Sequence, residues 1–457
     1  MYDFDAIVIG AGPSGISAAL TMARGGLKVS VLERGPYPGS KSLMGGILYT
    51  NVLASLLPDF LERGAPLERY ISRKGLSMLS REAEIAFSFA TTNWDAPPHN
   101  HSWTVLRAKF DRWFAAEAER EGVEIISGVV VDSLLKDADG RVTGVRSRVG
   151  EGQGAGEGDL KAPVVIVAEG ANSLIAEQEG LKPQLDDSMV AISAKETLKL
   201  SRETIEERFG VEGDAGVAIE FIGEATAGLP GAGFIYTNGD TLSVGVVVYL
   251  EELKASGLTP EELIVRFKAH PSVKPRVKGG EVIEYGAHLI PETGFNNLPL
   301  LMKDGLLLVG DSAGLVSTSP RHEGSNYAMA SGVFAGETVL AAKASGDYTT
   351  SALSGYKKRL EESFVLKNME RYRDWPGFVK TAPHLFAAWP SAFAALAEAS
   401  LEVGGDDAAV EGRLWDIFQR RIGLLPFGMT AMKMRNALKV LGYGKSGGII
   451  DYLSRNW

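Results

Sequence analysis

The stretch that decides the fold is DAIVIGAGPSG, residues 5–15. We expect a buried strand over 4–9, where the apolar run lies, and a helix that begins within the glycine-rich turn. A second strand is expected over 28–32, and Glu33 follows it, 21 residues after Gly12. Strand, glycine-rich turn, helix, strand and acidic residue in this order predict a Rossmann-type dinucleotide-binding unit.

Each residue of this turn has a physical role in binding a diphosphate. Gly10 permits the tight turn, Gly12 lets the backbone approach a pyrophosphate, and Gly15 allows the helix to pack closely on the strand. The N-terminus of the helix faces the anion. Glu33 can accept hydrogen bonds from both hydroxyls of an adenosine ribose, and its charge disfavours a 2′-phosphate. The sequence therefore indicates FAD or NAD rather than NADP.

A second signal favours FAD. Gly310-Asp311 closes an apolar strand expected over 305–309, Gly314 follows, and a long helix is expected over 324–340. In two-part flavin folds such a strand-end Gly-Asp places a carboxylate on the ribityl chain. A surface turn is the alternative interpretation, but the buried strand before the pair argues against it.

The remaining pattern predicts an interrupted α/β fold. We expect a helix over 106–121, a hairpin around Asp139-Gly140, and then spaced β-like segments between 185 and 295, such as 241–249. The fold class is therefore α/β, with a Rossmann-type two-part FAD-binding domain, an inserted antiparallel β-sheet substrate domain and a helical C-terminal region. The expected limits are 1–75, 105–185 and 300–345 for FAD binding, 76–104 and 186–299 for the insertion, and 346–457 for the helical region.

Composition excludes several classes of protein. The chain has 457 residues, 45% hydrophobic and 23% charged, which is typical of a globular protein. A net charge of −10 argues against nucleic acid as a partner. There is no cysteine, so the chain cannot form a disulfide or a cysteine-bound Fe–S cluster, and redox chemistry would need an organic cofactor. The six histidines are scattered, and the His99-x-His101 pair lacks a cluster of further ligands, so no metal site is expected.

The charge is unevenly distributed. Residues 411–457 carry a net charge of +5, and the basic, apolar stretch 428–441 suits docking to a bilayer or a partner protein. The apolar stretch 381–397 is broken by two prolines and is too short to span a membrane, so it is either an interfacial segment or a packed helical hairpin. With no signal-peptide pattern at the start, we expect a cytoplasmic, peripherally membrane-associated protein. An ordinary solvated tail remains the alternative.

Over nearly its whole length the chain resembles FixC-like electron transfer flavoprotein:quinone oxidoreductases, within the broader superfamily of geranylgeranyl reductases and aromatic hydroxylase-like flavoproteins. The resemblance is carried by these motifs: GAGPSG (10–15), LERG (32–35), GGILYTNVLASLLPDF (45–60), LRAKFDRW (106–113), AEGANS (168–173), GFIYTN (233–238), VGDSAG (309–314) and EGSNYAMASG (323–332).

The resemblance implies an FAD site. Gly45 and Gly46 would lie against the flavin ring, Arg107 would neutralise the pyrophosphate, and Val130 would contact adenine through its backbone. Around the expected helix start near 324, backbone N–H groups would stabilise an anionic reduced flavin, and His322 is a candidate proton donor. The alternatives are a simple turn at 45–46, a surface ion pair for Arg107 and an ordinary N-cap by Ser325. The full set of expected FAD contacts is Gly10, Gly12, Pro13, Ser14, Gly15, Glu33, Arg34, Gly45, Gly46, Arg107, Val130, Ala168, Gly170, Gly310, Asp311, Gly324, Ser325 and Asn326.

The segment 231–236 resembles the quinone-contacting segment of the family, in which small residues let a flat ring approach. The expected quinone contacts are Gly231, Ala232, Gly233 and Tyr236, and a strand with a glycine bulge is the alternative. Two departures from related families matter. Ala176 stands where NADPH-binding hydroxylases have Arg, which weakens the case for a nicotinamide reductant. The absent cysteines mean that a separate ferredoxin-like subunit would have to supply any Fe–S cluster.

The resemblance therefore predicts an enzyme in which FAD takes electrons from an electron transfer flavoprotein, directly or through an Fe–S subunit, and passes them to a membrane quinone. Two alternatives remain. One is an FAD-dependent reductase of isoprenoid double bonds, similar to geranylgeranyl reductases. The other is a non-catalytic flavin-bearing subunit that docks partners. Fold alone cannot separate them.

Overall fold

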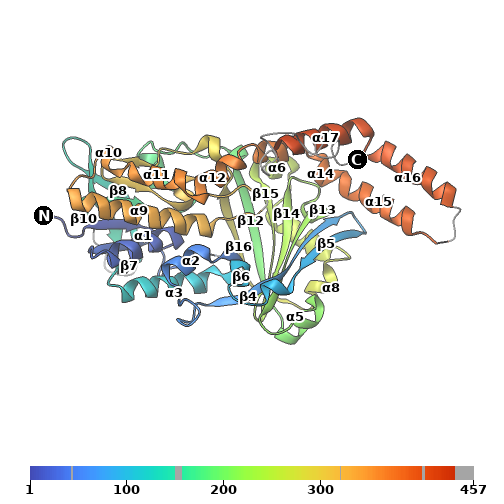
Figure 1. Ribbon diagram of the computed structural model, residues 1–457, viewed down its shortest axis with the longest axis horizontal. Coiled ribbons are helices and arrows are strands. Elements are labelled where there is room, and N and C mark those ends of the chain that lie inside the picture. Colours follow the sequence, from blue (N-terminus) through green and yellow to red (C-terminus); the bar gives the residue numbers. More distant parts are fainter. Residues whose placement is uncertain (43–44, 150–156, 320, 404–406, 438–457) are drawn as a thin grey trace.

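The computed structural model describes all residues except 43–44, 150–156, 320, 404–406 and 438–457. Three parts follow one another along the long axis (Figure 1). The first contains the N-terminus, α1, α3 and α9; because the nucleotide is expected there, we call it the nucleotide-binding half. A large twisted sheet lies in the middle, and C-terminal helices project at the other end. The fold class predicted from the sequence, with its helical C-terminal region, is confirmed.

Within the described residues, the strands form three sheets. The six-stranded sheet has the order β17 (Met302–Lys303), β18 (Leu306–Leu308), β11 (Val165–Val167), β1 (Ala6–Ile9), β2 (Val29–Glu33) and β7 (Glu124–Ser127). The three-stranded sheet has the order β10 (Glu157–Lys161), β9 (Val142–Val149) and β8 (Val129–Lys136). The nine-stranded sheet has the order β16 (Glu281–Pro291), β12 (Val190–Lys199), β15 (Thr241–Tyr249), β14 (Gly231–Thr237), β13 (Ala215–Gly223), β4 (Leu67–Leu79), β6 (Ser102–Leu106) and β3 (Gly45–Tyr49), with β5 (Glu84–Ala90) paired to β4.

The helices of the described residues are α1 (Pro13–Arg24), α2 (Asn51–Leu56), α3 (Arg107–Arg120), α4 (Leu174–Gln178), α5 (Arg202–Phe209), α6 (Leu250–Ser256), α7 (Pro260–Ala269), α8 (Lys274–Val277), α9 (Ser325–Ser345), α10 (Thr350–Leu353), α11 (Gly355–Glu362), α12 (Phe364–Arg371), α13 (Trp375–Thr381), α14 (His384–Ala387), α15 (Trp389–Leu401), α16 (Asp407–Arg421) and α17 (Leu424–Ala437).

The six-stranded sheet is parallel except at β17. Its central strands β1, β11 and β18 are fully buried, as expected for strands covered on both faces. The carboxyl ends of parallel strands meet at one edge of a sheet, which is where α/β proteins bind ligands. Gly10, Glu33, Ala168 and Gly310 therefore gather at the same edge, although up to 300 residues separate them.

Helices α1 and α9 lie side by side in the nucleotide-binding half, and two glycines allow this. An ideal Cβ on Gly332 would lie 2.1 Å from the carbonyl oxygen of Ser14, and one on Gly336 would lie 2.9 Å from that of Ala18. The residue numbers of both helices increase together from one contact to the next, so the two helices run parallel. Ser325 precedes Gly332 by seven residues, so α9 begins about 10 Å beyond the start of α1.

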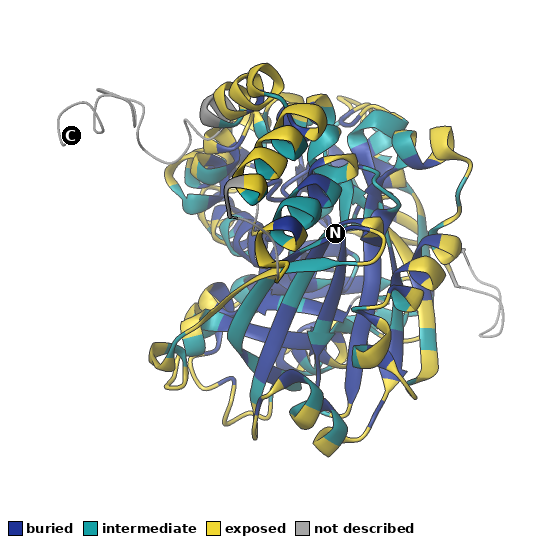
Figure 2. Cartoon of the chain, turned by 90° about the vertical axis from the view of Figure 1, so that its right-hand side faces the viewer, coloured by how far each residue is buried: buried dark blue, intermediate teal, exposed yellow. Residues whose placement is uncertain are grey.

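The nine-stranded sheet contains strands from the expected inserted domain and from the expected FAD-binding domain. β3 and β4 belong to it, although they were expected in the nucleotide-binding domain, and the expected limit at residue 75 falls inside β4. The sheet is antiparallel except where β13 pairs with β4. One face packs against α7, with Phe221 and Phe267 in edge-to-face contact 5.1 Å apart. Strands β14 and β15 in its middle are largely buried, whereas β5 and β16 at its margins are largely exposed (Figure 2).

The C-terminal helices pack on the large sheet and on one another. Trp389, at the start of α15, is buried and contacts Phe393 and Phe427. α16 lies against α15, and both project away from the body (Figure 1). The stretch 381–397 is thus helical in α14 and α15; no residue of α14 is buried, whereas Trp389, Pro390 and Ala392 of α15 are. Of the basic stretch 428–441, residues 438–441 lie outside the described residues.

Candidate functional site

The glycine-rich turn has the geometry predicted for it. Gly10 has φ +103°, and an ideal Cβ there would lie 2.4 Å from the carbonyl oxygen of Ala168, so only glycine fits. One on Gly15 would lie 2.0 Å from the carbonyl oxygen of Gly10. Gly12 differs, because its backbone is extended and no atom lies within 4 Å of an ideal Cβ. The protein itself does not require glycine at position 12, whereas a group bound at the start of α1 would.

The end of β2 provides a carboxylate beside this turn. Glu33 Oε2 accepts a hydrogen bond from the Ala11 N–H at 3.0 Å, and Oε1 accepts one from the Gly35 N–H at 2.6 Å. Val130 lies close by, since the Gly128 N–H donates to the Gly35 carbonyl at 2.8 Å and β8 begins one residue later. Arg34 is exposed. The expected adenosine contacts therefore gather around one strand end.

The Gly310-Asp311 pair lies between α1 and α9. The Gly310 N–H donates to Ser331 Oγ at 2.9 Å, and an ideal Cβ on Gly310 would lie 2.7 Å from Ser14 Oγ. Burial raises the pKa of the Asp311 carboxyl, while His288 and Arg107 nearby favour its charged form and lower that pKa. The pair is thus held close to the start of α1.

Arg107 lies at the start of α3, facing the start of α9. Its Nε and Nη2 atoms donate to the two carboxylate oxygens of Asp111 at 2.6 and 2.7 Å, and Nη1 reaches Ser325 Oγ at 3.4 Å. The side chains of Arg107 and Asp111 are 14% and 3% exposed. Arg107 therefore forms a buried pair rather than a surface ion pair, and Nη1 is the nitrogen directed at the expected cofactor site.

The start of α9 is open in the way the start of α1 is open. Gly324 is the N-cap and no atom lies within 4 Å of an ideal Cβ there, so Ser325 is not the capping side chain. Asn326 is 2% exposed; its Nδ2 donates to Glu323 Oε2 at 3.0 Å, while its Oδ1 has no partner among the described residues. His322 is exposed in the preceding loop.

Together these groups fit FAD. A carboxylate lies at the adenosine end, an open helix start suits the diphosphate, Asp311 suits the ribityl chain, and a second open helix start about 10 Å further on suits the ring. The unpartnered Asn326 Oδ1 and the open space at Gly12, Gly170 and Gly324 are what a bound group would fill. Bound FAD supplies the capacity to accept and release electrons, and the chain supplies position and charge.

β3 pairs with β6 at the edge of the nine-stranded sheet and also lies across one face of that sheet, over β4 to β15. Pairing of neighbouring strands places Lys74, Ala218, Tyr236, Ser243, Thr197 and Glu284 in one continuous row across β4, β13, β14, β15, β12 and β16. We call this the polar row. An ideal Cβ on Gly45 would lie 2.3 Å from Ser243 Oγ, and Tyr49 lies beside Lys74 with 3.2 Å between Tyr49 Oη and Lys74 Nζ. β3 is about 13 Å long and the row from Ser243 to Lys74 about 14 Å, so the strand lies along it.

The expected quinone segment forms β14, but its glycines have a packing role. An ideal Cβ on Gly231 would lie 2.1 Å from the Val247 carbonyl oxygen, and one on Gly233 would lie 3.0 Å from Phe267 and from Ala225. Ala232 and Tyr236 point to the opposite face, which carries the polar row. The quinone assignment stays a prediction, and Tyr236 is its member on the polar row.

Sequence reasoning missed several polar groups of this face. Lys74 contacts Tyr49, and Lys195 Nζ donates to Glu284 Oε2 at 3.0 Å. Burial lowers the pKa of both lysines. No signal in the sequence indicated Lys74, because the charged residues of 67–79 are adjacent at 68–69 and 73–74 rather than alternating, and its partner comes from another strand. Asp111 could have been found, because it lies four residues after Arg107 on a helix.

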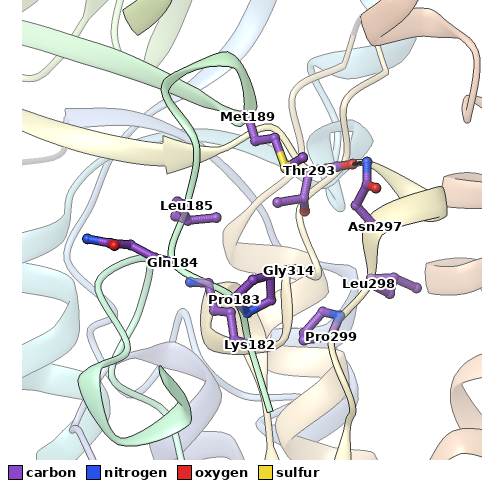
Figure 3. A pocket seen from close by; sticks show the side chains of 10 residues that line it. All are labelled: Lys182, Pro183, Gln184, Leu185, Met189, Thr293, Asn297, Leu298, Pro299 and Gly314. Atoms are coloured by element: carbon purple, nitrogen blue, oxygen red, sulfur yellow. Dashed lines mark hydrogen bonds between the residues drawn. The ribbon is translucent and has the colours of Figure 1, made fainter. Parts of the chain in front are cut away.

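The remaining sites carry less chemistry. His99 stacks on Tyr70 with ring centroids 4.2 Å apart, and among the described residues no three His, Asp or Glu side chains form a metal-binding group. A separate cavity of about 230 Å³ lies behind Gly314 (Figure 3), where the buried Lys182 Nζ donates to the Ala171 carbonyl at 2.6 Å. It contains none of the residues expected to bind FAD or quinone. Its lining is Lys182, Pro183, Gln184, Leu185, Met189, Thr293, Asn297, Leu298, Pro299 and Gly314. No helix in the described part of the chain is long and apolar enough to cross a membrane.

Comparison with known proteins identifies the family of the chain. The family model described as FAD dependent oxidoreductase matches residues 5–179. Protein FixC of Azorhizobium caulinodans is 40% identical over 90% of this chain and 95% of its own. The probable electron transfer flavoprotein-quinone oxidoreductase YdiS of Escherichia coli is 36% identical over 95% of this chain and 99% of its own.

A solved structure shares the fold. The geranylgeranyl bacteriochlorophyll reductase-like protein of Thermoplasma acidophilum is 19% identical, with a TM-score of 0.67 that covers 95% of this chain and 99% of that one. At 19% identity this structure shows the fold alone, whereas identities of 36–40% over nearly the full length show the family. The chain belongs to the FixC-like family of electron transfer flavoprotein–quinone oxidoreductases and is an FAD-dependent oxidoreductase.

Proposed function

We propose that this enzyme takes electrons from an electron transfer flavoprotein onto its FAD and passes them to a quinone. The observation that carries the proposal is full-length similarity to a relative named as such an oxidoreductase. The site supports it, because the open start of α9 lies near β3, and β3 crosses a face lined by both polar and aromatic groups. Since the chain has no cysteine, any Fe–S centre on the electron path would belong to a separate ferredoxin-like subunit.

The expected FAD contacts divide by position. Glu33 and Val130 would hold the adenosine end, Gly12 and the start of α1 the diphosphate, and Asp311 the ribityl chain. Gly45, Gly46 and the start of α9 would surround the ring, where the positive end of the helix dipole favours negative charge on a reduced flavin. Arg107 would act through Nη1, the nitrogen that Asp111 does not hold.

The membrane surface would be formed by α16 and α17. Exposed apolar side chains gather there beside basic ones, a combination that suits an anionic lipid surface. The apolar members are Trp415, Leu424, Leu425, Phe427, Met429 and Met432, and the basic ones are Arg420, Arg421 and Lys433.

A flotation experiment tests this surface. The full chain should float with vesicles that contain anionic lipid, and Leu425→Glu should reduce the bound fraction severalfold, because Leu425 is 74% exposed and its loss should leave the fold intact. Val282→Glu, at an exposed site on β16, is the matched control. Equal flotation of wild type and Leu425→Glu would argue against α17 as the membrane surface.

The electron path is tested by two half-reactions. Reduced electron transfer flavoprotein should reduce the bound flavin, and a soluble quinone analogue should reoxidise it. Fast reduction by NADPH with no response to quinone would instead support reduction of isoprenoid double bonds. A flavin that responds to neither quinone nor nicotinamide would support a docking subunit.

A further inference from the structure

The strand β4 places a lysine on the polar row without an acidic partner. Lys74 is half-buried, and its Nζ lies 3.2 Å from Tyr49 Oη and 5.1 Å from the centre of the Tyr49 ring. Among the described residues, no carboxylate forms an ion pair with it. Lys195, the other lysine on this face, has Glu284 at 3.0 Å. Because an ammonium group is costly to bury unpaired, the state of Lys74 calls for an explanation.

Tyr49 holds this lysine in place. The Tyr49 hydroxyl donates to the Arg321 carbonyl at 3.1 Å, so its oxygen is free to accept from Lys74. That hydrogen bond ties β3 to the loop that leads into α9, three residues before Gly324. Two N–H groups of the ammonium remain for an acceptor that is not part of the described chain. Lys74 is therefore a positioned donor at one end of the polar row, and Tyr49 links it to the loop before α9.

The surroundings of Lys74 set its acidity. Burial lowers its pKa, Glu220 on β13 and Glu323 in the loop before α9 raise it, and Arg321 lowers it. Phe89 on β5 pairs opposite Lys74, so the side of the neighbouring strand is apolar. Tyr236, the expected quinone contact, lies in the same row with only the methyl group of Ala218 between them.

We propose that Lys74 is the proton donor to the quinone and that Tyr49 is a residue that positions it. This rests on the proposed function. Reduction of a quinone takes two electrons and two protons, and both C=O bonds become C–O–H groups. Bound reduced FAD would supply the two electrons and one of the two protons. The Lys74 ammonium gives the second proton to a quinone oxygen and is protonated again from solvent, so charge and atoms balance.

The test uses the full FAD-loaded chain, photoreduced without oxygen and mixed with a short-chain ubiquinone or menaquinone analogue at a series of pH values. For the wild type, the rate of flavin reoxidation should fall as the pH rises through the pKa of Lys74, because the donor is the ammonium form. Lys74→Met should be about 100-fold slower below that pKa and lack the pH dependence, since a general acid is typically worth this much. Lys74→Arg keeps the charge but does not release its proton, so it should also be slow.

A second readout separates proton donation from a structural role. The affinity of the oxidised enzyme for the quinone analogue, measured from the change in flavin absorbance, should fall in Lys74→Met and be kept in Lys74→Arg. Tyr49→Phe should shift the midpoint of the pH profile and keep the bound FAD. Lys199→Met is the matched control, because Lys199 is exposed and pairs with Asp240 at the end of β12.

The outcomes are distinguishable. If no quinone reoxidises the wild-type flavin, the proposed function fails and this inference fails with it. If the wild type reacts and Lys74→Met keeps its rate and pH profile with FAD bound, only the inference is overturned. If Lys74→Met loses FAD, the test rests on Lys74→Arg and Tyr49→Phe. A wild-type pH profile of flavin reoxidation in both variants would overturn the inference.

Discussion

The nucleotide-binding half and the nine-stranded sheet use glycine for different purposes. At Gly12 and Gly324 no protein atom lies within 4 Å of an ideal Cβ, and both lie at the start of a helix. At Gly231 and Gly233 an ideal Cβ would meet a backbone oxygen or the Phe267 ring at 3.0 Å or less. At an open helix start, Gly12 and Gly324 leave room for a bound group, whereas Gly231 and Gly233 let protein atoms pack closely. The same residue type in two predicted sites therefore carries different information.

Two cations, one from each region, differ in a similar way. Arg107, in the nucleotide-binding half, holds Asp111 through two hydrogen bonds. Lys74, in the large sheet, contacts a tyrosine hydroxyl. The first cation is part of a completed pair, and the second is arranged to donate to something else.

The largest expected effect concerns the completed pair. Arg107→Met leaves Asp111, which is 3% exposed, without its partner and should lower the free energy of unfolding by about 3–5 kcal/mol. Urea denaturation of the FAD-free protein measures it. Arg107→Met/Asp111→Asn should recover most of the loss. Unchanged stability of the single variant would mean that the pair is not formed in solution.

The next effect tests the open glycine. Gly12→Val should weaken FAD binding by 100-fold or more, about 2.7 kcal/mol, because the side chain occupies the space at the start of α1. The melting temperature of the FAD-free protein should not change, since the extended backbone at Gly12 accepts any residue. Titration with FAD and thermal melting give the two values. A variant that binds FAD normally would place the diphosphate elsewhere.

The packed glycine should give the opposite pattern. Gly233→Val forces a side chain against Phe267 and Ala225 and should destabilise the protein by about 1–3 kcal/mol while FAD is retained. Denaturation and flavin content distinguish the two cases. A stable Gly233→Val whose flavin no longer reacts with quinone would restore a direct role for this glycine in quinone binding.

The smallest effect is a pH dependence in the large sheet. Burial raises the pKa of Glu292 to about 7, and the charge of Lys380 opposes this shift. The folded state therefore binds a proton more tightly than the unfolded state, and the resulting stability is full below the unfolded pKa and lost as the pH rises to about 7. Because Glu292 is partly exposed, solvent screening reduces the effect, and we expect the free energy of unfolding to change by on the order of 1 kcal/mol. Glu292→Gln should remove it from melting curves measured across this range.

Much of the nucleotide-binding half could be predicted because its signals are local. The strand, the turn, α1 and Glu33 lie within the first 33 residues, and the hairpin around Asp139-Gly140 appears as β8 and β9. The alternating stretch 124–135 forms two strands, β7 and β8, since Gly128 with φ +76° separates them. Local pattern gives the type of element more surely than its limits.

The large sheet could be predicted only in part, because its contacts are between distant segments. The strand at 241–249 has the limits expected for it. However, β3 and β4 join this sheet through pairing with β6 and β13, and no short pattern reports such pairing. The contact of Lys74 with Tyr49 depends on β3 lying along the polar row. Likewise, the sequence could not show whether Gly231 and Gly233 face a ligand or a helix.

The central claim is that electrons leave the FAD of this enzyme for a quinone. The most direct measurement is to photoreduce the bound flavin without oxygen, add a soluble menaquinone or ubiquinone analogue, and follow flavin absorbance, with NADH and NADPH tested separately on the oxidised form. The account predicts fast reoxidation by quinone and no reduction by either nicotinamide. Rapid reduction by NADPH together with indifference to quinone would contradict it.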